Sequence, residues 1–464
     1  MEFLESVENA VKEFNNLEKR TVRIIGHLDA DGISSTSILI SALKRENIKF
    51  NVSIIKQVDQ NILDELKKEE YSTIFFVDLG SGNLDMIEKT LNSKTIFVLD
   101  HHKPEDVKTN LIHVNPHLYN IDGDIELSGA GVVYFFVRKL NERNKDLAYL
   151  AVIGAIGDMQ ESKGFVGLNN EVLKDAIQSR KIEVKDGLRM FGVQTKPIHK
   201  VLEYSTDPYV PGVTGNERGA IRFLEEIGIE LKENGKYKKL IHLNQDDTKK
   251  LVTGIILRRL GSEDKPEDVL GPIYLLTNEE EENPTKDARE FATLLNACGR
   301  LNKPSLGIGT CLENAGIKAK AINLLIDYKK EIINSLNWFY SHRNTGDIIE
   351  KKGYIIINAE DNIRDTLIGT LASIISKSNL YVNGTIILAL AHTLEEDTKV
   401  SARICGNSNI DVREIINDIL KVTGGIGGGH KGAGGCLILQ EKEEEFIKTA
   451  EKILGKIAIE EEIK

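Results

Sequence analysis

The feature that most constrains this chain is an apolar segment, residues 95–104 (TIFVLDHHKP), that passes directly into polar groups. Its first five residues have strand character, and Asp100, His101 and His102 follow at once. In open parallel α/β sheets, ligands bind in the crevice outside the carboxyl ends of the strands. The segment therefore predicts a buried strand that carries one carboxylate and two imidazoles toward a ligand.

Three further apolar segments end in the same way: residues 21–31 (TVRIIGHLDAD), 73–78 (TIFFVD) and 150–158 (LAVIGAIGD). Their polar ends are His27, Asp29, Asp31, Asp78 and Asp158. A single Asp after a strand is more often a helix N-cap or a turn residue. Several carboxylates gathered with imidazoles can instead hold two divalent cations, the arrangement that hydrolyses phosphate esters. Without cations, so many carboxylates at one sheet edge would repel each other.

The ordered motifs HLDADG, VDLG, LDHHKP and GAIGDM resemble the four motifs of the DHH phosphoesterase superfamily. Downstream, residues 427–435 (GGGHKGAGG) and 401–403 (SAR) resemble the DHHA1 domain that accompanies it. Within this superfamily the chain resembles the archaeal RecJ-like nucleases. Two segments of the middle, DPYVPGVTGNE and AREFATLLNACGRLNKPSLG, are similar to the same group.

The resemblance implies a site for two Mn²⁺ ions, with Mg²⁺ or Co²⁺ as substitutes. The implied metal ligands are His27, Asp29, Asp31, Asp78, His101 and Asp158. His27 and Asp29 would hold one ion, the remaining ligands the other, and Asp78 would bridge both. His102 would contact the scissile phosphate and Asp100 would orient a neighbouring imidazole, which makes these two the implied catalytic residues. Bacterial RecJ-like sequences usually have Asp where this chain has His27.

We predict an α/β fold with an N-terminal parallel-sheet DHH domain (residues 1–205) and a smaller α/β C-terminal DHHA1 domain (346–464). Residues 206–345 between them are predicted to be a mainly helical connector or insertion. The DHHA1 domain would bind the substrate, and the active-site cleft would lie between the two α/β domains. The alternation of strands and helices in the first domain is typical of a parallel sheet covered on both faces.

The strands predicted in the first domain are residues 21–26, 50–56, 73–77 and 95–99, and the helices are 34–43, 60–68, 83–91 and 128–140. The strands predicted in the last domain are 353–357, 385–391, 399–404 and 436–440, and the helices are 364–376, 412–422 and 443–457. The glycine run 424–435 is predicted to lie between a helix and a strand. His113 and His117 are interpreted as local turn residues beside Pro116 and are not assigned to the site.

A glycine-rich loop permits close backbone approach to a phosphodiester, with amides as donors. The predicted substrate-binding residues are Ser401, Arg403, Gly428, Gly429, His430 and Lys431. Alternatively, the glycines form only a tight turn and Arg403 makes a surface salt bridge. The presence of the Asp-His-His motif in the same chain favours the substrate-binding interpretation.

The chain has a net charge of −11, whereas nucleic-acid-binding proteins usually carry a basic surface. Part of the acidity belongs to the metal cluster, and more lies in residues 279–282 and 441–445, which we interpret as solvated faces. No apolar run approaches the length of a membrane helix, and no secretory signal precedes the first domain. A cytoplasmic protein without membrane association is expected, and its four cysteines are expected to be buried.

The resulting hypothesis is a Mn²⁺-dependent exonuclease that hydrolyses single-stranded DNA or RNA to 5′-mononucleotides in DNA replication or repair. One alternative is a phosphodiesterase for very short oligonucleotides. Another is a replisome scaffold subunit with weak or no nuclease activity, although every expected ligand is present. A replisome or nuclease-complex protein could bind the middle segment. The preferred nucleic acid and the polarity of degradation stay open.

Overall fold

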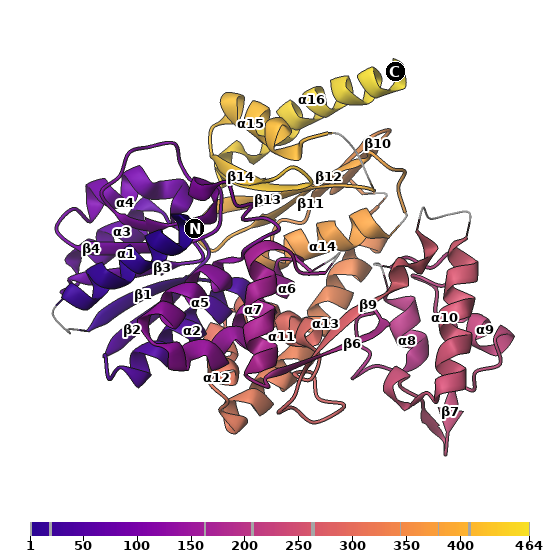
Figure 1. Ribbon diagram of the computed structural model, residues 1–464. Coiled ribbons are helices and arrows are strands. Elements are labelled where there is room, and N and C mark those ends of the chain that lie inside the picture. Colours follow the sequence, from indigo (N-terminus) through magenta and orange to yellow (C-terminus); the bar gives the residue numbers. More distant parts are fainter. Residues whose placement is uncertain are drawn as a thin grey trace. The chain divides into compact units, whose positions relative to one another are not determined.

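The computed structural model describes residues 2–17, 21–161, 164–205, 208–260, 265–343, 345–378, 380–406 and 410–463. It divides into two compact units, Met1–Leu325 and Ile326–Lys464, which Figure 1 shows in sequence colours. The predicted boundaries of three domains, and the cleft, stay predictions. Across the described ranges, no helix is both long and apolar enough to cross a membrane. All four cysteines are buried and free, as expected.

The first unit contains a parallel five-stranded sheet with the order β2-β1-β3-β4-β5. Its strands are β1 (Val22–His27), β2 (Phe50–Ile55), β3 (Thr73–Val77), β4 (Thr95–Leu99) and β5 (Ile112–Val114). The first four confirm the predicted strands. β5 was not predicted, because three residues with His113 at the centre are too short to show an alternating pattern.

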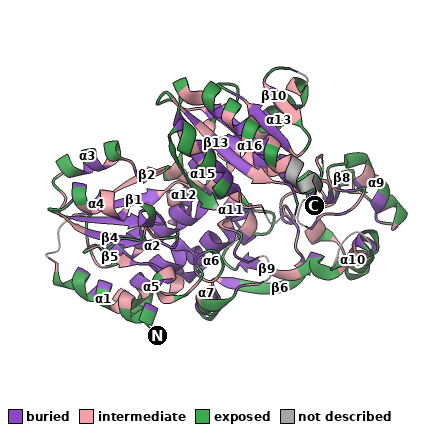
Figure 2. Ribbon diagram, turned by 90° about the horizontal axis from the view of Figure 1, so that it is seen from above, coloured by how far each residue is buried: buried purple, intermediate pink, exposed green. Residues whose placement is uncertain are grey.

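Helices cover both faces of this sheet. They are α1 (Glu2–Asn16), α2 (Ala30–Arg45), α3 (Gln60–Lys68), α4 (Leu84–Thr90) and α5 (Gly129–Leu140). On one face Phe75 and Phe97 stack at 4.4 Å between ring centroids, and Phe14 of α1 and Phe136 of α5 meet Phe75 edge-on. On the other face, alternate strand residues form a core with α3 and α4. Figure 2 shows strands β1 and β4 as largely buried, as expected of parallel strands covered on both faces, whereas the edge strand β2 is only partly buried.

Helix α2 packs against α5 and against the apolar helix α6 (Ala148–Gly157). Helix α7 (Gly167–Gln178) packs in turn on α6. An antiparallel ribbon of β6 (Ile182–Leu188) and β9 (Leu270–Leu276) then leads to and from an insertion. The insertion contains α8 (Ile198–Glu203), α9 (Glu217–Glu226), α10 (Gln245–Arg259) and a hairpin of β7 (Lys232–Glu233) and β8 (Lys236–Tyr237). These elements form a separate hydrophobic core.

After the insertion come α11 (Ala288–Arg300), α12 (Pro304–Cys311) and α13 (Ala315–His342), and α13 carries the boundary between the units. α11 contacts the insertion through the buried Glu290 side chain. The carboxylate of Glu290 accepts hydrogen bonds from the Gln194 amide at 3.0 Å and from the Thr195 hydroxyl. Burial raises the pKa of Glu290 from 4.5 to about 7.

We expect Glu290→Gln to remove a pH-dependent loss of stability. Between pH 4.5 and about 7 the folded chain retains a proton at Glu290 that the unfolded chain releases, so stability falls as the pH rises. Above this range the ionised Glu290 lowers the free energy of unfolding by on the order of 3 kcal/mol. Relative to wild type, Glu290→Gln should therefore gain unfolding free energy at pH 8 but not at pH 5, measured by denaturant unfolding. The exposed Glu281→Gln is the control, and an equal gain at both pH values would contradict the prediction.

The second unit contains a six-stranded sheet with the order β10-β11-β12-β13-β15-β14, in which only β11 and β12 are parallel. Its strands are β10 (Ile348–Lys351), β11 (Tyr354–Asn358), β12 (Ile386–His392), β13 (Asp397–Ile404), β14 (Ile426–His430) and β15 (Ala433–Leu439). Its helices after α13 are α14 (Asp365–Lys377), α15 (Val412–Thr423) and α16 (Glu443–Ile463). α15 and α16 share one hydrophobic core with the sheet, and α14 packs on β12 and β13.

The glycine run was predicted to lie between elements, and this prediction was wrong. Most of these glycines lie in the hairpin of β14 and β15. A Cβ at Gly427 would lie 2.7 Å from Leu420, and one at Gly434 would lie 2.8 Å from Ile416, both residues of α15. At these two positions a side chain would compete with the ends of the Leu420 and Ile416 side chains, a tertiary contact that strand propensity does not reveal.

Candidate metal centre

The register of the parallel sheet places three polar strand ends at one edge. Gly26 pairs with Val77, and Val77 pairs with Leu99, so the residues that follow them, His27, Asp78 and Asp100, leave the sheet together. Asp78 is 1% exposed and has a φ of 61°, a left-handed conformation that turns the chain sharply after β3. The sequence-predicted strand ends therefore meet as expected.

Asp31 reaches this edge from the first turn of α2. Its side chain is fully buried, with Oδ2 accepting from the Gly129 amide at 2.7 Å and Oδ1 from the Ala130 amide at 3.1 Å. These are amides of the first turn of α5, where unpaired N–H groups stabilise a negative charge. The N-terminus of α5 therefore fixes both oxygens of Asp31.

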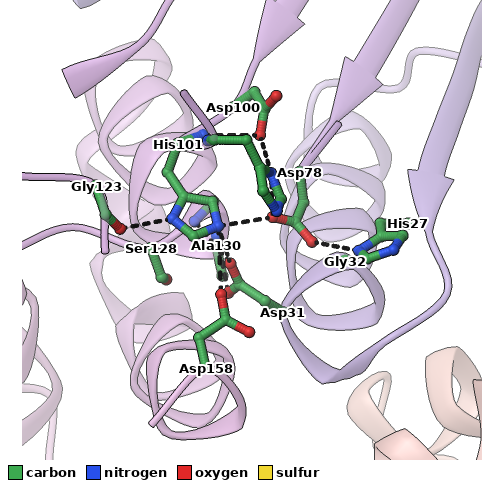
Figure 3. A network of polar contacts seen from close by, with 12 residues as sticks. His27, Asp31, Gly32, Asp78, Asp100, His101, Gly123, Ser128, Ala130 and Asp158 are labelled. Atoms are coloured by element: carbon green, nitrogen blue, oxygen red, sulfur yellow. Dashed lines mark hydrogen bonds and ion pairs between the residues drawn. The ribbon is translucent and has the colours of Figure 1, made fainter. Parts of the chain in front are cut away.

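His101 lies at the centre of the cluster. Its Nδ1 donates to the carbonyl oxygen of Gly123 at 2.7 Å, which directs Nε2 toward the carboxylates (Figure 3). Nε2 lies 3.2 Å from Asp158 Oδ2 and 3.3 Å from Asp78 Oδ1. Both Nε2 and Asp78 Oδ1 are buried, and neither makes a hydrogen bond to a described residue. A ring held through one nitrogen with the other directed at carboxylates is the usual arrangement of a metal-binding histidine.

His27 and Asp29 form the other side of the cluster. His27 Nδ1 lies 3.0 Å from Asp29 Oδ2 and 3.3 Å from Asp78 Oδ2. Asp29 is also the N-cap of α2, because its Oδ1 accepts from the Gly32 amide at 2.9 Å. Gly32 itself lies in the first turn of α2, not before the helix as predicted, and a Cβ there would lie 2.4 Å from the His27 carbonyl oxygen.

All six predicted metal ligands are therefore brought together. The ligand atoms of His27, Asp29 and Asp78 lie within 4.8 Å of one another, as do those of Asp31, His101 and Asp158. Asp78 contacts both groups, through His27 and through His101. The two groups contain the residues of the two predicted ion positions, except that Asp78 belongs to the first group only. Asp78, His101 and His102 form a third group of ligand atoms within the same distance.

Asp100 and His102 stand beside these groups. Asp100 is fully buried and accepts hydrogen bonds from the amides of Ser81 (2.9 Å), His101 (2.8 Å) and His102 (3.2 Å). Asp100 Oδ1 also accepts from His102 Nδ1 at 2.8 Å. Both carboxylate oxygens of Asp100 thus accept hydrogen bonds. The bond to Nδ1 orients the ring of His102, whose side chain is 39% exposed.

The electrostatics of the cluster fit cations. Burial, together with Asp78 and Asp158, raises the pKa of Asp31 well above its usual value, and burial also raises the pKa of Asp158. Burial disfavours a charged His101, yet Asp158 and Asp78 raise the pKa of this imidazole well above its usual value. The metal-free cluster therefore retains protons that a bound cation would displace. The oxygen and nitrogen donors suit a divalent transition-metal ion. Asp78 Oδ1 and His101 Nε2, which make no hydrogen bond to a described residue, could serve as its ligands.

Sequence reasoning missed an outer layer of polar groups. The Ser81 hydroxyl lies 2.9 Å from His113 Nε2 and accepts from Asn115 Nδ2 at 2.9 Å. Asn115 also donates to the carbonyl oxygen of His102 at 2.8 Å. These residues connect β5 to the backbone around Asp100. His113 was interpreted as a local turn residue because its strand was not recognised.

The predicted substrate-binding residues gather in the second unit. Strand pairing places Ser401 opposite Gly435, which in turn pairs with Gly428, and it places Arg403 opposite Ala433. Arg403 is held by the Ser373 hydroxyl at 2.8 Å and by the Ala402 carbonyl oxygen at 2.7 Å. The exposed residues of the set are Gly428, Gly429 and Lys431. The side chain of His430 lies outside the described residues.

Three segments of the chain match known families. Residues 21–155 match the DHH family, N-terminal domain, residues 190–269 the DHH-CID domain, and residues 351–456 the DHHA1 domain. The uncharacterized protein MJ0831 of Methanocaldococcus jannaschii is 31% identical over 463 residues, which cover 97% of each chain. The single-stranded-DNA-specific exonuclease RecJ of Thermus thermophilus is 28% identical over 182 residues, or 37% of this chain and 27% of that protein.

Solved structures share the fold. The crystal structure of RecJ in complex with Mn²⁺ from Thermus thermophilus superimposes with a TM-score of 0.60 at 17% identity. The match covers 97% of this chain, which spans only 55% of that RecJ chain. The crystal structure of CDC45 from Entamoeba histolytica superimposes with a TM-score of 0.62 at 14% identity and covers 98% of both chains.

Proposed function

The chain belongs to the DHH family and carries a C-terminal DHHA1 domain, and from this membership we propose that it is a metal-dependent exonuclease for single-stranded nucleic acid. The observation that carries the proposal is the pair of ligand groups, which Asp78 connects through its contacts with His27 and His101. The relatives named RecJ, one of them in complex with Mn²⁺, support it. Mn²⁺ is therefore the proposed cofactor, and hydrolysis of phosphodiesters to 5′-mononucleotides is the proposed reaction.

In this proposal, His27, Asp29 and Asp78 hold one divalent ion, and Asp31, Asp78, His101 and Asp158 hold the other. The ions would supply an activated water and stabilise negative charge on the phosphate. Although burial disfavours the charged ring, Asp100 raises the pKa of His102, and the resulting imidazolium would donate from Nε2 to the scissile phosphate while Nδ1 donates to Asp100. Ser401, Arg403 and the exposed glycines of β14 would bind the nucleic-acid backbone.

Hydrolysis of end-labelled single-stranded DNA and RNA of several lengths tests the proposal. We expect stepwise release of mononucleotides with Mn²⁺ and none with chelator. Asp158→Ala should lower the rate by about 10²-fold, because it removes a ligand of only one ion position. The control Asp146→Asn changes an exposed carboxylate that pairs with Arg45 at the far end of α2, and it should retain the wild-type rate.

The same series separates the alternatives. Cleavage of dimers and trimers only would favour a phosphodiesterase for short oligonucleotides and overturn the exonuclease proposal. No hydrolysis of any substrate by protein that binds Mn²⁺ would favour a replisome scaffold subunit. The similarity to CDC45 over 98% of both chains is the observation that keeps this second function in consideration.

A further inference from the structure

Helix α11 lies against the segment that carries Asp29 and Asp31, although 266 residues separate them in sequence. The Ala30 amide donates to Asn296 Oδ1 at 3.0 Å. One turn further along α11, a Cβ at Gly299 would lie only 1.7 Å from the Leu28 carbonyl oxygen. α11 therefore packs directly against the backbone of Leu28 and Ala30, the two neighbours of Asp29.

The Ala30 amide needs a partner because Ala30 is the first residue of α2. The first amides of a helix have no acceptor within the helix. The Asp29 side chain accepts a hydrogen bond from the Gly32 amide, and the Asn296 side chain accepts one from the Ala30 amide. The backbone N–H also defines the orientation of the Asn296 side chain, because only the amide oxygen can accept this bond.

We propose that Asn296 is a positioning residue for the metal centre, which holds the N-terminus of α2 so that Asp29 and Asp31 present their carboxylates correctly. The inference rests on the proposed metal centre and adds to it a residue outside the four sequence motifs. Asn296 does not contact the ions. It acts through one hydrogen bond to the peptide unit that joins the two ligands.

The structure also indicates which ion position depends more on Asn296. Two amides of α5 hold Asp31 independently. Asp29 is held by its own helix, through the Gly32 amide, and by His27. Loss of the Asn296 bond should therefore weaken mainly the position formed by His27, Asp29 and Asp78.

Mn²⁺ binding to the chelator-treated full chain tests the inference, measured from the electron paramagnetic resonance signal of free Mn²⁺. Asn296→Ala removes the acceptor, Asn296→Leu removes it with the same number and branching of side-chain heavy atoms, and Asn296→Asp retains an acceptor oxygen. Thr293→Ala is the matched control, because Thr293 lies one turn earlier on α11 and its hydroxyl donates to the Arg289 carbonyl oxygen of the same helix. Thermal unfolding in chelator reports the purely structural effect of each change.

We expect Asn296→Ala and Asn296→Leu to weaken one of two Mn²⁺ binding steps by about 10- to 100-fold, the usual effect of removing a group that orients metal ligands. Asn296→Asp and Thr293→Ala should bind Mn²⁺ nearly as wild type does. In an Asp158→Ala background, which isolates the other ion position, the remaining step should show the same loss.

Unchanged Mn²⁺ affinity in both acceptor-free variants would overturn the inference, whatever their thermal stability. A loss that also appears in Thr293→Ala would overturn it, because the effect would then be general to α11. If wild type binds Mn²⁺, the variants show the expected loss and no substrate is hydrolysed, the inference is supported and the proposed activity alone is overturned. A wild-type chain that does not bind Mn²⁺ would overturn both.

Discussion

Replacing Asp78 with Asn is expected to reduce hydrolysis of single-stranded substrate by at least about 10⁴-fold, which corresponds to roughly 5 kcal/mol of transition-state stabilisation. Asp78 contacts both ligand groups, through His27 at 3.3 Å and His101 at 3.3 Å. One substitution should therefore impair both proposed ion positions, whereas loss of Asp158 impairs one. The measurement is single-turnover hydrolysis with saturating Mn²⁺.

The same substitution should abolish the gain in thermal stability that Mn²⁺ gives to the wild-type protein. Ions that bind the folded state raise the unfolding temperature, and Asp78 contacts both ligand groups. Asn tolerates the left-handed conformation at this position, where φ is 61°, so the variant should fold. The measurement is the unfolding temperature in chelator and with added Mn²⁺.

Asp85→Asn provides the control for both effects. Asp85 is an exposed carboxylate on α4 that pairs with Lys89, and its substitution should change neither the rate nor the rise in unfolding temperature with Mn²⁺. If Asp78→Asn retained activity within tenfold of wild type, Asp78 would not be a shared ligand. A full Mn²⁺-induced rise in the unfolding temperature of Asp78→Asn would show that neither ion position requires Asp78.

The parts of the fold that the sequence predicted are those with strong local signals. β3 and β4 are short runs of β-branched and aromatic residues that end abruptly in Asp78 and Asp100. Parallel pairing then brings those ends together without further information, so the approach of His27, Asp78 and Asp100 followed from strand assignment alone. Asp31 and Asp158 reach the site from helices α2 and α6, which strand assignment does not place. The DHH resemblance added the assignment of each ligand to an ion, which stays a prediction.

The parts that were not predicted depend on contacts distant in sequence. β5 is a strand only because β4 pairs with it. In the hairpin of β14 and β15, a Cβ at Gly427 or Gly434 would compete with side chains of α15. Asn296 looks like any polar residue of an amphipathic helix, and its contact with Ala30 becomes visible only in three dimensions. Local propensity carries no information on such pairings.

Gly129→Ala should have the second-largest effect on the metal centre, with hydrolysis reduced by about 10³-fold, or roughly 4 kcal/mol. Alanine normally stabilises a helix relative to glycine. At this position, however, the added Cβ would lie 2.3 Å from Asp78 Oδ1, while the Gly129 amide still holds Asp31 at 2.7 Å. The new methyl group would displace the carboxylate that both ligand groups share. The measurements are the rate of hydrolysis and the affinity for Mn²⁺.

Gly131→Ala is the matched control, because it introduces the same methyl group one residue beyond Ala130 in α5. Its Cβ would meet the flexible end of the Leu127 side chain and no predicted metal ligand. This variant should retain Mn²⁺ affinity, even if repacking of Leu127 costs some stability. Equal losses of Mn²⁺ affinity in the two variants would show that the integrity of α5, and not the space beside Asp78, determines metal binding. A loss confined to Gly129→Ala would show that the missing Cβ is what makes room for the shared ligand.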